Sequence, residues 1–563
     1  MTPADAAGDP AAAFDRIVAE YYPAWFRFHP DAAVAAGVPG YDHRLPPYGD
    51  DDVGALLTLD QELLGSIEEL DLSALDPDRQ LDCRLLYGAA VLEMEELLAR
   101  DWRRRDPARY LPVDGIHQLV ARGVPDLGPA LAARLDAVPA HLRGARPLLA
   151  EAPEGLPPPW LASAVEEARG GAEFLRGLEQ HPRVAPLVRA QRLAPRLAAA
   201  AEAVDAFADF LEGELAPRAA GDFACGSRRF EHLLRYRHAL GVTPEALHAF
   251  GQRLFDQTRR ELLDACRALA GHEDVAALSA RIEADHPAAA DLLGAYREAM
   301  AAARAFLETH ELVTLPEDER LAVVETPVFL RHRIPFAAYL EPAPNDPRQQ
   351  GYYYVTPVTD AAELRAHHRA GIAHTSVHEA WPGHHLQFVT ANRAGTGLVR
   401  FLNPSATLYE GWALYSEQLM HEAGFLDRPE QGFVLLRDRL WRALRVVIDV
   451  EIHCRGLSLE AAAERMVRHL GFTPAQARGE LNWYCQAPTV PMGYATGWAL
   501  INACRDRQRL AEGRAFSLRG FHDRLLGVGA CALPLVIERA FGLARWEEAR
   551  HLVFGAAPGA ARG

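Results

Sequence analysis

The sequence is poor in cysteine and has no paired-cysteine motif. Its 563 residues include seven cysteines, an odd number, scattered through the chain and never in a Cys-x-x-Cys arrangement. Disulfide frameworks need paired cysteines in an oxidising compartment, and cysteine zinc sites need closely spaced pairs. The cysteine content therefore favours a reducing compartment and argues against both a disulfide scaffold and a cysteine-based zinc site.

Long apolar runs and an excess of basic residues are also missing. No apolar run approaches the roughly 18 residues of a transmembrane helix, and residues 1–22 lack the basic-then-apolar order of a signal peptide. Asp and Glu together number 76 and Lys and Arg together 59, which gives a formal net charge of −17. Because an acidic surface repels nucleic acids and anionic membranes, we expect neither as a partner. The lack of a readable signal peptide and of a membrane span predicts a cytoplasmic protein.

Motifs for nucleotide and serine chemistry are absent as well. The sequence contains no glycine-rich phosphate loop, dinucleotide fingerprint or nucleophile elbow. Apolar residues at 49% and charged residues at 24% are normal for a globular protein. These observations leave nucleotide-dependent and serine-hydrolase functions without support.

Most of the chain has the pattern of packed amphipathic helices. Apolar residues recur three and four apart from about residue 11 to 104 and again through long segments between 127 and 310. From 315 to 358 the composition changes to β-branched and aromatic residues broken by prolines, which is typical of short strands. We therefore expect a mainly α-helical fold with a small antiparallel sheet. We expect it to divide into an N-terminal helical region (1–310) and a second region (311–563) that contains the sheet, within one continuous architecture.

One stretch, HTSVHEAWPGHHLQ from His374 to Gln387, concentrates four histidines and a glutamate. Zinc hydrolases often carry His-Glu-x-x-His on one helix, because histidines four apart share a face and the glutamate can act as a base. His378 and Glu379 begin this motif, but Pro382 stands where its second histidine would be. The pattern therefore indicates a metal site whose second histidine arrives two or three residues late.

The residues alone leave the partner of His378 open. On an ideal helix His385 would lie nearly above His378 but roughly 10 Å along the axis, and His384 would point about a third of a turn away. Both choices need a distorted helix, for which Pro382 supplies a reason because it lacks an N–H and its ring clashes with the preceding turn. His374 has the undistorted spacing to His378 but no glutamate directly after it. The structural alternative is that these histidines cap and line packed helices.

Two strings extend the pattern to a known family. HEAWPGHHLQ, followed by YEGWALYSE from Tyr409 to Glu417, resembles the bacterial family catalogued as domain of unknown function 885. That family in turn resembles the gluzincins, the zinc metallopeptidases that use a glutamate as third ligand. The likeness continues through LWRALRVVIDVEIH and FHDRLLGVGACALPLV and covers most of the chain. The resemblance implies a large helical, zincin-type architecture with one zinc ion per chain.

The resemblance also implies roles for individual residues. The Gly-His pair at His384 is similar to the end of the motif in related families. Glu410 follows 26 residues later (410 − 384), close to the separation of their glutamate ligand. The implied ligands are therefore His378, His384 and Glu410, with Glu379 as the base that moves protons. The alternative metal ligands are His385, Glu417 and His374. His453 and Tyr494 are the implied donors to the oxyanion that forms during hydrolysis, and Tyr484 and Arg445 are implied to bind the substrate.

A strand beside the motif is a further implied feature. In peptidases of this type, a sheet edge holds extended substrate by strand addition. By resemblance, residues 351–355 would form that edge, which assigns Tyr353 and Tyr354 to substrate binding. The alternative is an amphipathic edge strand without a binding role.

Together these features predict a zinc-dependent hydrolase of amide or peptide bonds in small substrates, such as short peptides or N-acyl amino acids. The sequence departs from the family's pattern near Glu451 and Leu457 and from residue 482 to 492, in the region expected to form the substrate pocket. These departures motivate one alternative, a metal-dependent lyase or tailoring enzyme acting on a small metabolite. The other alternative is a helical binding protein without catalysis. The sequence leaves the oligomeric state open.

Overall fold

A computed structural model describes residues 9–331, 334, 336–358 and 360–555 of the chain. Residues 1–8, part of the stretch on which the predicted absence of a signal peptide depends, lie outside this description. Contacts group the chain into two compact units, Met1–Phe223 with Pro327–Arg333, and Ala224–Thr326 with Ile334–Gly563. The division into domains at residue 310 stays a prediction, because compact units are defined by contacts and not by independent folding.

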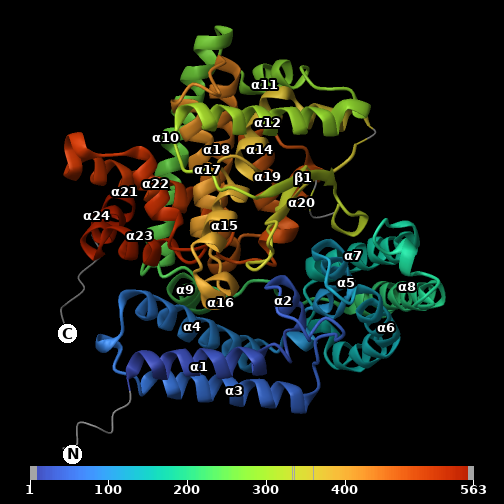
Figure 1. The fold of residues 1–563 in the computed structure, drawn as a ribbon. Coiled ribbons are helices and arrows are strands. Elements are labelled where there is room, and N and C mark those ends of the chain that lie inside the picture. Colours follow the sequence, from blue (N-terminus) through green and yellow to red (C-terminus); the bar gives the residue numbers. More distant parts are fainter. Residues whose placement is uncertain (1–8, 332–333, 335, 359, 556–563) are drawn as a thin grey trace, which may run out of the picture. The chain divides into compact units, whose positions relative to one another are not determined.

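Packed helices make up the described part of the first unit. Its α-helices, labelled in Figure 1, are α1 (Pro10–Trp25), α2 (Pro30–Ala35), α3 (Asp50–Glu68), α4 (Pro77–Glu95), α5 (Val113–Arg122), α6 (Leu127–Ala150), α7 (Pro158–Gly177) and α8 (Leu193–Phe210). The side chains of Asp9 and Asp76 cap α1 and α4 by accepting hydrogen bonds from first-turn amides, and a proline follows each cap. Local sequence therefore determines where these two helices begin.

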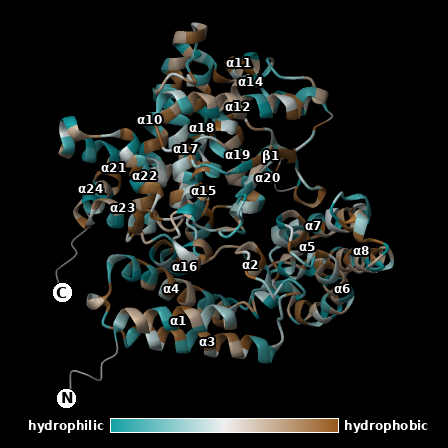
Figure 2. Cartoon of the chain, viewed as in Figure 1, coloured by the Kyte–Doolittle hydropathy of each residue, from teal (hydrophilic) through white to brown (hydrophobic). Residues whose placement is uncertain are grey.

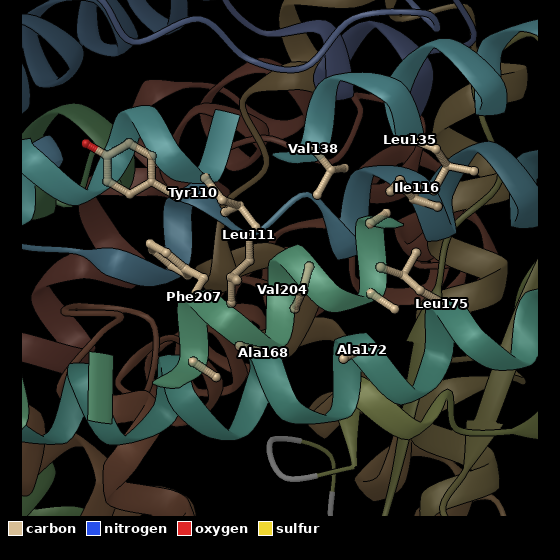
Figure 3. Packing of buried hydrophobic residues seen from close by; sticks show 14 of the residues in the cluster. Tyr110, Leu111, Ile116, Leu135, Val138, Ala168, Ala172, Leu175, Val204 and Phe207 are labelled. Atoms are coloured by element: carbon tan, nitrogen blue, oxygen red, sulfur yellow. The ribbon is translucent and has the colours of Figure 1, made fainter. Parts of the chain in front are cut away.

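The core of the first unit lies where α6 and α7 pack against α8 (Figure 3). Small residues such as Ala168 and Ala172 on α7 pack in the same cluster as Val204 on α8, and small residues let helix axes approach closely. The returning segment Pro327–Arg333 joins this unit because the Cα of Phe329 lies 2.8 Å from where a Cβ of Gly170 would be. All of the predicted site residues lie in the second unit.

The second unit contains the motif. Its α-helices are α9 (Gly226–His232), α10 (Pro244–Ala270), α11 (Val275–Glu283), α12 (Leu292–His310), α13 (Ala361–Leu364), α14 (Arg369–Glu379), α15 (His384–Arg393), α16 (Gly397–Leu402), α17 (Ala406–Glu422), α18 (Pro429–Cys454), α19 (Leu459–Leu470), α20 (Pro474–Tyr484), α21 (Gly493–Glu512), α22 (Leu518–Leu526), α23 (Leu533–Phe541) and α24 (Leu543–Phe554). Helix α10 packs along α18, and α17 packs along α21 and against α14 and α15 (Figure 1). The motif helices are thus held against α17 and α18.

Two glycines allow α17 and α21 to cross in backbone contact. A Cβ on Gly411 would collide with the Cα of Gly497, and a Cβ on Gly497 would overlap the carbonyl of Thr407. Because the opposing atoms belong to the backbone, no flexible side chain can move aside. The crossing fixes the position of α17, the helix that carries Glu410 and Glu417.

We expect Gly497→Ala to destabilise the protein by about 1–3 kcal/mol, because the added methyl group overpacks this crossing. The matched control is Gly479→Ala in α20, where nothing lies within 4 Å of the new methyl group. That control should be neutral or stabilising by up to about 1 kcal/mol, because alanine favours helix more than glycine does. Urea unfolding of both variants measures the difference, and equal midpoints would contradict the prediction.

The sheet is mixed and not antiparallel as predicted. Its strands are β1 (Arg320–Glu325), β2 (Ala337–Leu340) and β3 (Gln350–Val355), in the order β1-β3-β2. Tyr353 of β3 pairs with Val323 in the parallel β1 and with Tyr339 in the antiparallel β2. The chain leaves β1, passes through Pro327–Arg333 and β2, and returns, and this long connection lets β3 run in the same direction as β1.

The predicted mainly helical fold with a small sheet beside the motif is confirmed. The sheet packs against α12 and α14 through a cluster that includes Tyr353, Val355 and Ile372. Figure 2 shows hydrophilic and hydrophobic residues alternating along the long helices, as expected for amphipathic packing. Within the described residues, no helix combines the length and the apolar composition required to span a membrane.

Candidate metal centre

The distortion predicted at Pro382 is a complete break between α14 and α15. Proline has no N–H for the helical hydrogen bond, so the first helix ends before it. Gly383 then passes so close to the last turn of α14 that a Cβ would overlap the carbonyl of His378. A glycine is therefore needed at this position. The break brings the imidazole rings of His378 and His384 to a centre-to-centre distance of 4.9 Å.

Four buried side chains meet at this break. One carboxylate oxygen of Glu410, in the first turns of α17, lies 3.3 Å from His378 Nε2 and 3.5 Å from His384 Nε2. Glu379 Oε2 lies 3.9 Å from His384 Nε2. His378, Glu379 and His384 each offer a ligand atom within 4.8 Å of the others. The structure therefore brings together the four residues that the sequence analysis placed at the metal.

The donor set fits a small divalent cation. In a tetrahedral zinc site with bonds of about 2.0–2.1 Å, adjacent ligand atoms are roughly 3.3 Å apart. The two distances made by Glu410 are close to that value. Two imidazoles and one carboxylate also leave a fourth position open, as in catalytic zinc sites. Glu379 lies further from His384 Nε2 than Glu410 does, at 3.9 Å against 3.5 Å, and therefore fits better as a neighbouring base than as a ligand.

A second layer of polar contacts orients His378. Its Nδ1 lies 2.8 Å from Glu417 Oε1, and the other oxygen of Glu417 lies 3.6 Å from His374 Nδ1. The second ring nitrogen of His374 lies 3.0 Å from the carbonyl of Gln431. A carboxylate on the far nitrogen of a metal-binding histidine fixes the orientation of its ring. The alternates His374 and Glu417 thus lie behind His378.

Burial and neighbouring charges shift pKa values in opposite directions. Burial alone would lower the pKa of His378, but hydrogen bonds with Glu410 and Glu417 raise it to about 10. Burial would raise the pKa of Glu410, but His384 and His378 hold that pKa below its usual range. Burial raises the pKa of Glu379. A cation that binds here therefore has to displace a proton from His378.

Glu417→Gln should weaken zinc binding by about 10- to 100-fold, because the neutral amide no longer holds the His378 ring through a charged hydrogen bond. Competition with a chromophoric chelator measures the affinity. The control is Glu422→Gln at the end of the same helix, where the side chain is 44% exposed and pairs with Arg505. An unchanged affinity in Glu417→Gln would mean that Glu417 does not position the ligand.

Tyr494, Arg445 and Tyr484 form a chain of contacts that ends at the centre. The ring of Tyr494 lies 6.2 Å from that of His378, and its hydroxyl lies near the Glu410 carboxylate. Burial raises the pKa of Tyr494 well above its usual value, so the hydroxyl keeps its proton. The guanidinium carbon of Arg445 lies 4.4 Å from the Tyr494 ring centre, and its Nε donates to the Tyr484 hydroxyl at 2.6 Å. Three residues named from the sequence therefore lie in one chain of contacts that leads from Glu410.

The structure does not bring His453 to the centre. Its Nε2 lies 3.0 Å from the carbonyl oxygen of Tyr484, and the backbone N–H of Cys225 donates to its Nδ1 at 3.4 Å. His453 also lies eight residues beyond Arg445 on α18 (453 − 445), or about 12 Å along the helix. Both ring nitrogens therefore serve backbone groups, and this placement gives the predicted oxyanion role no support.

Tyr353 and Tyr354 lie on the middle strand of the sheet. Because residues 352–355 of β3 pair with β1 on one side and with β2 on the other, they leave no edge to which a substrate strand could add. The predicted strand addition at residues 351–355 is therefore wrong. The Tyr353 hydroxyl lies 3.5 Å from the hydroxyl of Ser376 on α14. This contact joins the sheet to the first motif helix.

Residues 30–539 match the family described as bacterial protein of unknown function (DUF885). The chain belongs to the DUF885 family. Two solved structures named "putative lipoprotein" share the fold of this DUF885 protein. One, of unknown function, is from Shewanella oneidensis (20% identity, TM-score 0.74, covering 93% of this chain and 98% of that chain). The other is from Colwellia psychrerythraea (18% identity, TM-score 0.76, covering 96% and 99%).

A more remote similarity joins this DUF885 protein to an M32 carboxypeptidase from Deinococcus radiodurans (13% identity, TM-score 0.40, covering 96% of this chain and 100% of that chain). No curated protein sequence matches the chain. The resemblance to the DUF885 family that the motif strings indicated is confirmed by the match to residues 30–539.

Two residues near the centre of the DUF885 protein were missing from the sequence predictions. Glu319, just before β1, lies 2.8 Å from His385 Nε2, and the hydroxyl of Tyr339 on β2 lies 2.9 Å from His385 Nδ1. The alternate ligand His385 is therefore engaged on both ring nitrogens. The ring of Tyr339 also stacks on His384, with ring centres 6.1 Å apart. The only signal for Tyr339 was its place in the strand-like segment.

Proposed function

We propose that this DUF885 protein is a zinc-dependent hydrolase that cleaves amide or peptide bonds in small substrates. The observation that carries the proposal is the contact of one buried Glu410 oxygen with two imidazole nitrogens, at 3.3 and 3.5 Å, beside a fourth buried group, Glu379. His378, His384 and Glu410 would hold the metal. Zinc supplies a Lewis acid that lowers the pKa of a water molecule to about 7.

Glu379 is the proton carrier in this proposal. Its carboxylate takes a proton from the attacking water and passes it to the nitrogen that leaves when the C–N bond breaks. Burial raises the pKa of Glu379, which makes the carboxylate a better base. Glu417 and His374 keep His378 in place meanwhile, so they act as positioning residues.

Tyr494 is the donor for the negative charge that develops on the substrate oxygen. The hydroxyl keeps its proton because burial raises its pKa, and it lies near the Glu410 carboxylate at the centre. A hydrogen bond from a fixed donor in a buried site stabilises an oxyanion more than water does.

Cytoplasmic residence belongs to the same proposal, with a small molecule or short peptide as substrate and neither nucleic acid nor membrane as a partner. It is supported by seven free cysteines and by the net charge of −17. Zinc is preferred over other cations because two imidazoles and one carboxylate form a common catalytic zinc set.

Hydrolysis assays on the full-length chain test the proposal. Dipeptides and N-acyl amino acids are incubated with protein as purified, after chelation of metal, and after re-addition of zinc, and the released amines are quantified. We expect cleavage in the first and third samples and none in the second. A protein that holds about one zinc per chain but cleaves none of them would contradict the proposal and favour a metal-dependent lyase or tailoring enzyme. A protein that binds no metal would favour a helical binding protein.

A further inference from the structure

Helix α18 carries two arginines, Arg442 and Arg445, whose guanidinium groups lie near the same two aromatic rings beside the centre. Their guanidinium carbons lie 4.2 Å (Arg442) and 4.3 Å (Arg445) from the ring centre of Trp441. Both also approach the ring of Tyr494, at 6.0 and 4.4 Å. Since the Tyr494 hydroxyl lies near the Glu410 carboxylate, the two cations lie about one tyrosine side chain away from a proposed metal ligand.

Both guanidinium groups have buried N–H groups without a hydrogen-bond partner among the described residues. Arg445, which is 5% exposed, donates to Tyr484 and Glu480, but its Nη1 has no partner. In Arg442, both Nε and Nη1 lack partners, and the 3.7 Å separation from Asp438 is too long for a hydrogen bond. Buried donors are normally bonded. Two cations beside the same two rings therefore carry N–H donors that the described chain does not satisfy.

The chemistry of these donors indicates the group that would satisfy them. A guanidinium is planar, permanently charged and shaped to donate parallel hydrogen bonds to a carboxylate. Glu480 and Tyr484 hold Arg445 in one orientation through its other nitrogens, so little side-chain freedom would be lost on binding. A neutral ligand would bring no new counter-charge to these two positive groups.

We propose that Arg442 and Arg445 bind a free carboxylate of the substrate. The inference rests on the proposed function, because it specifies the substrate class of the same site. Two residues of extended chain span roughly 7 Å. A carboxylate one residue away from the amide to be cleaved therefore suits the short distance, about one tyrosine side chain, between Glu410 and the two arginines. The substrates are then N-acyl amino acids or peptides with a free C-terminal carboxylate.

Ligand binding to the metal-free, full-length chain separates this inference from catalysis, since it requires neither zinc nor turnover. N-acetyl-leucine and N-acetyl-leucinamide differ in the carboxylate alone, and calorimetry gives the affinity of each. We expect the acid to bind at least about tenfold more tightly. Arg442→Gln and Arg445→Gln should each remove most of that preference. Arg437→Gln on the same helix, whose arginine pairs with Glu283 at 3.1 Å, should retain it.

Equal affinities for acid and amide, or no binding of the acid, would overturn the inference. A preference that persists in folded Arg442→Gln would overturn it as well, and this variant decides the matter if circular dichroism shows that Arg445→Gln does not fold. Binding of the acid without any hydrolysis by the zinc-loaded chain would contradict the catalytic proposal alone. Hydrolysis of both compounds at equal kcat/KM, with equal affinities, would overturn the carboxylate site alone.

Discussion

Glu379→Gln is expected to lower kcat/KM for amide hydrolysis by about 10²- to 10⁴-fold, the usual contribution of a general base, with zinc still bound. Glutamine has nearly the same size and fits the same buried position, but it cannot accept a proton at neutral pH. Zinc should stay because the Glu379 carboxylate lies further from His384 Nε2 than the Glu410 carboxylate does, at 3.9 Å against 3.5 Å. Assays on a substrate from the hydrolysis screen, together with elemental analysis, measure both quantities.

The two readings of Glu379 give different outcomes for this variant. If Glu379 were a ligand together with His378 and His384, as their mutual distances within 4.8 Å permit, the variant would lose zinc along with activity. If Glu379 only transfers protons, activity falls and zinc remains. Full activity in the variant would exclude the mechanism. Glu422→Gln on α17 is the control for a glutamate of the same unit outside the centre.

The residue types of the centre could be predicted from the sequence because the chemistry is concentrated locally. His378, Glu379 and the late histidines lie within eight residues (385 − 378 + 1), and few other functions need that combination. The choice between His384 and His385 could not be made from spacing. It depends on the break at Gly383, where the chain passes against the carbonyl of His378 at a distance that periodicity does not encode.

Features that depend on contacts far apart in the sequence were the least predictable. Glu410 was named through the family resemblance, since nothing local links it to His378, 32 residues earlier. Glu319 reaches His385 across 66 residues and was missed. Strand direction was missed because alternation looks alike in parallel and antiparallel pairs. His453 shared a helix with Arg445, but helix membership does not show which end of the helix faces the centre.

The adjacent histidines provide the second large expected effect. His384→Ala should lower zinc affinity by more than about 100-fold, because losing a direct ligand costs more than the 10- to 100-fold typical of an orienting partner. His385→Ala should retain about one zinc per chain, since both of its ring nitrogens are engaged by Glu319 and Tyr339. It should instead destabilise the protein by about 1–3 kcal/mol, because Glu319 loses a buried hydrogen bond.

Zinc content and urea unfolding, measured on both variants, separate metal binding from structural support. Loss of zinc in His385→Ala with retention in His384→Ala would mean that the break at Gly383 directs the other imidazole to the metal. Loss in both would mean that the bond between His385 and Tyr339, whose ring stacks on His384, is needed to hold the ligand in place. His378→Ala combined with Glu410→Ala gives the reference for a centre without ligands. Zinc retained in that double variant would place the metal elsewhere in the chain.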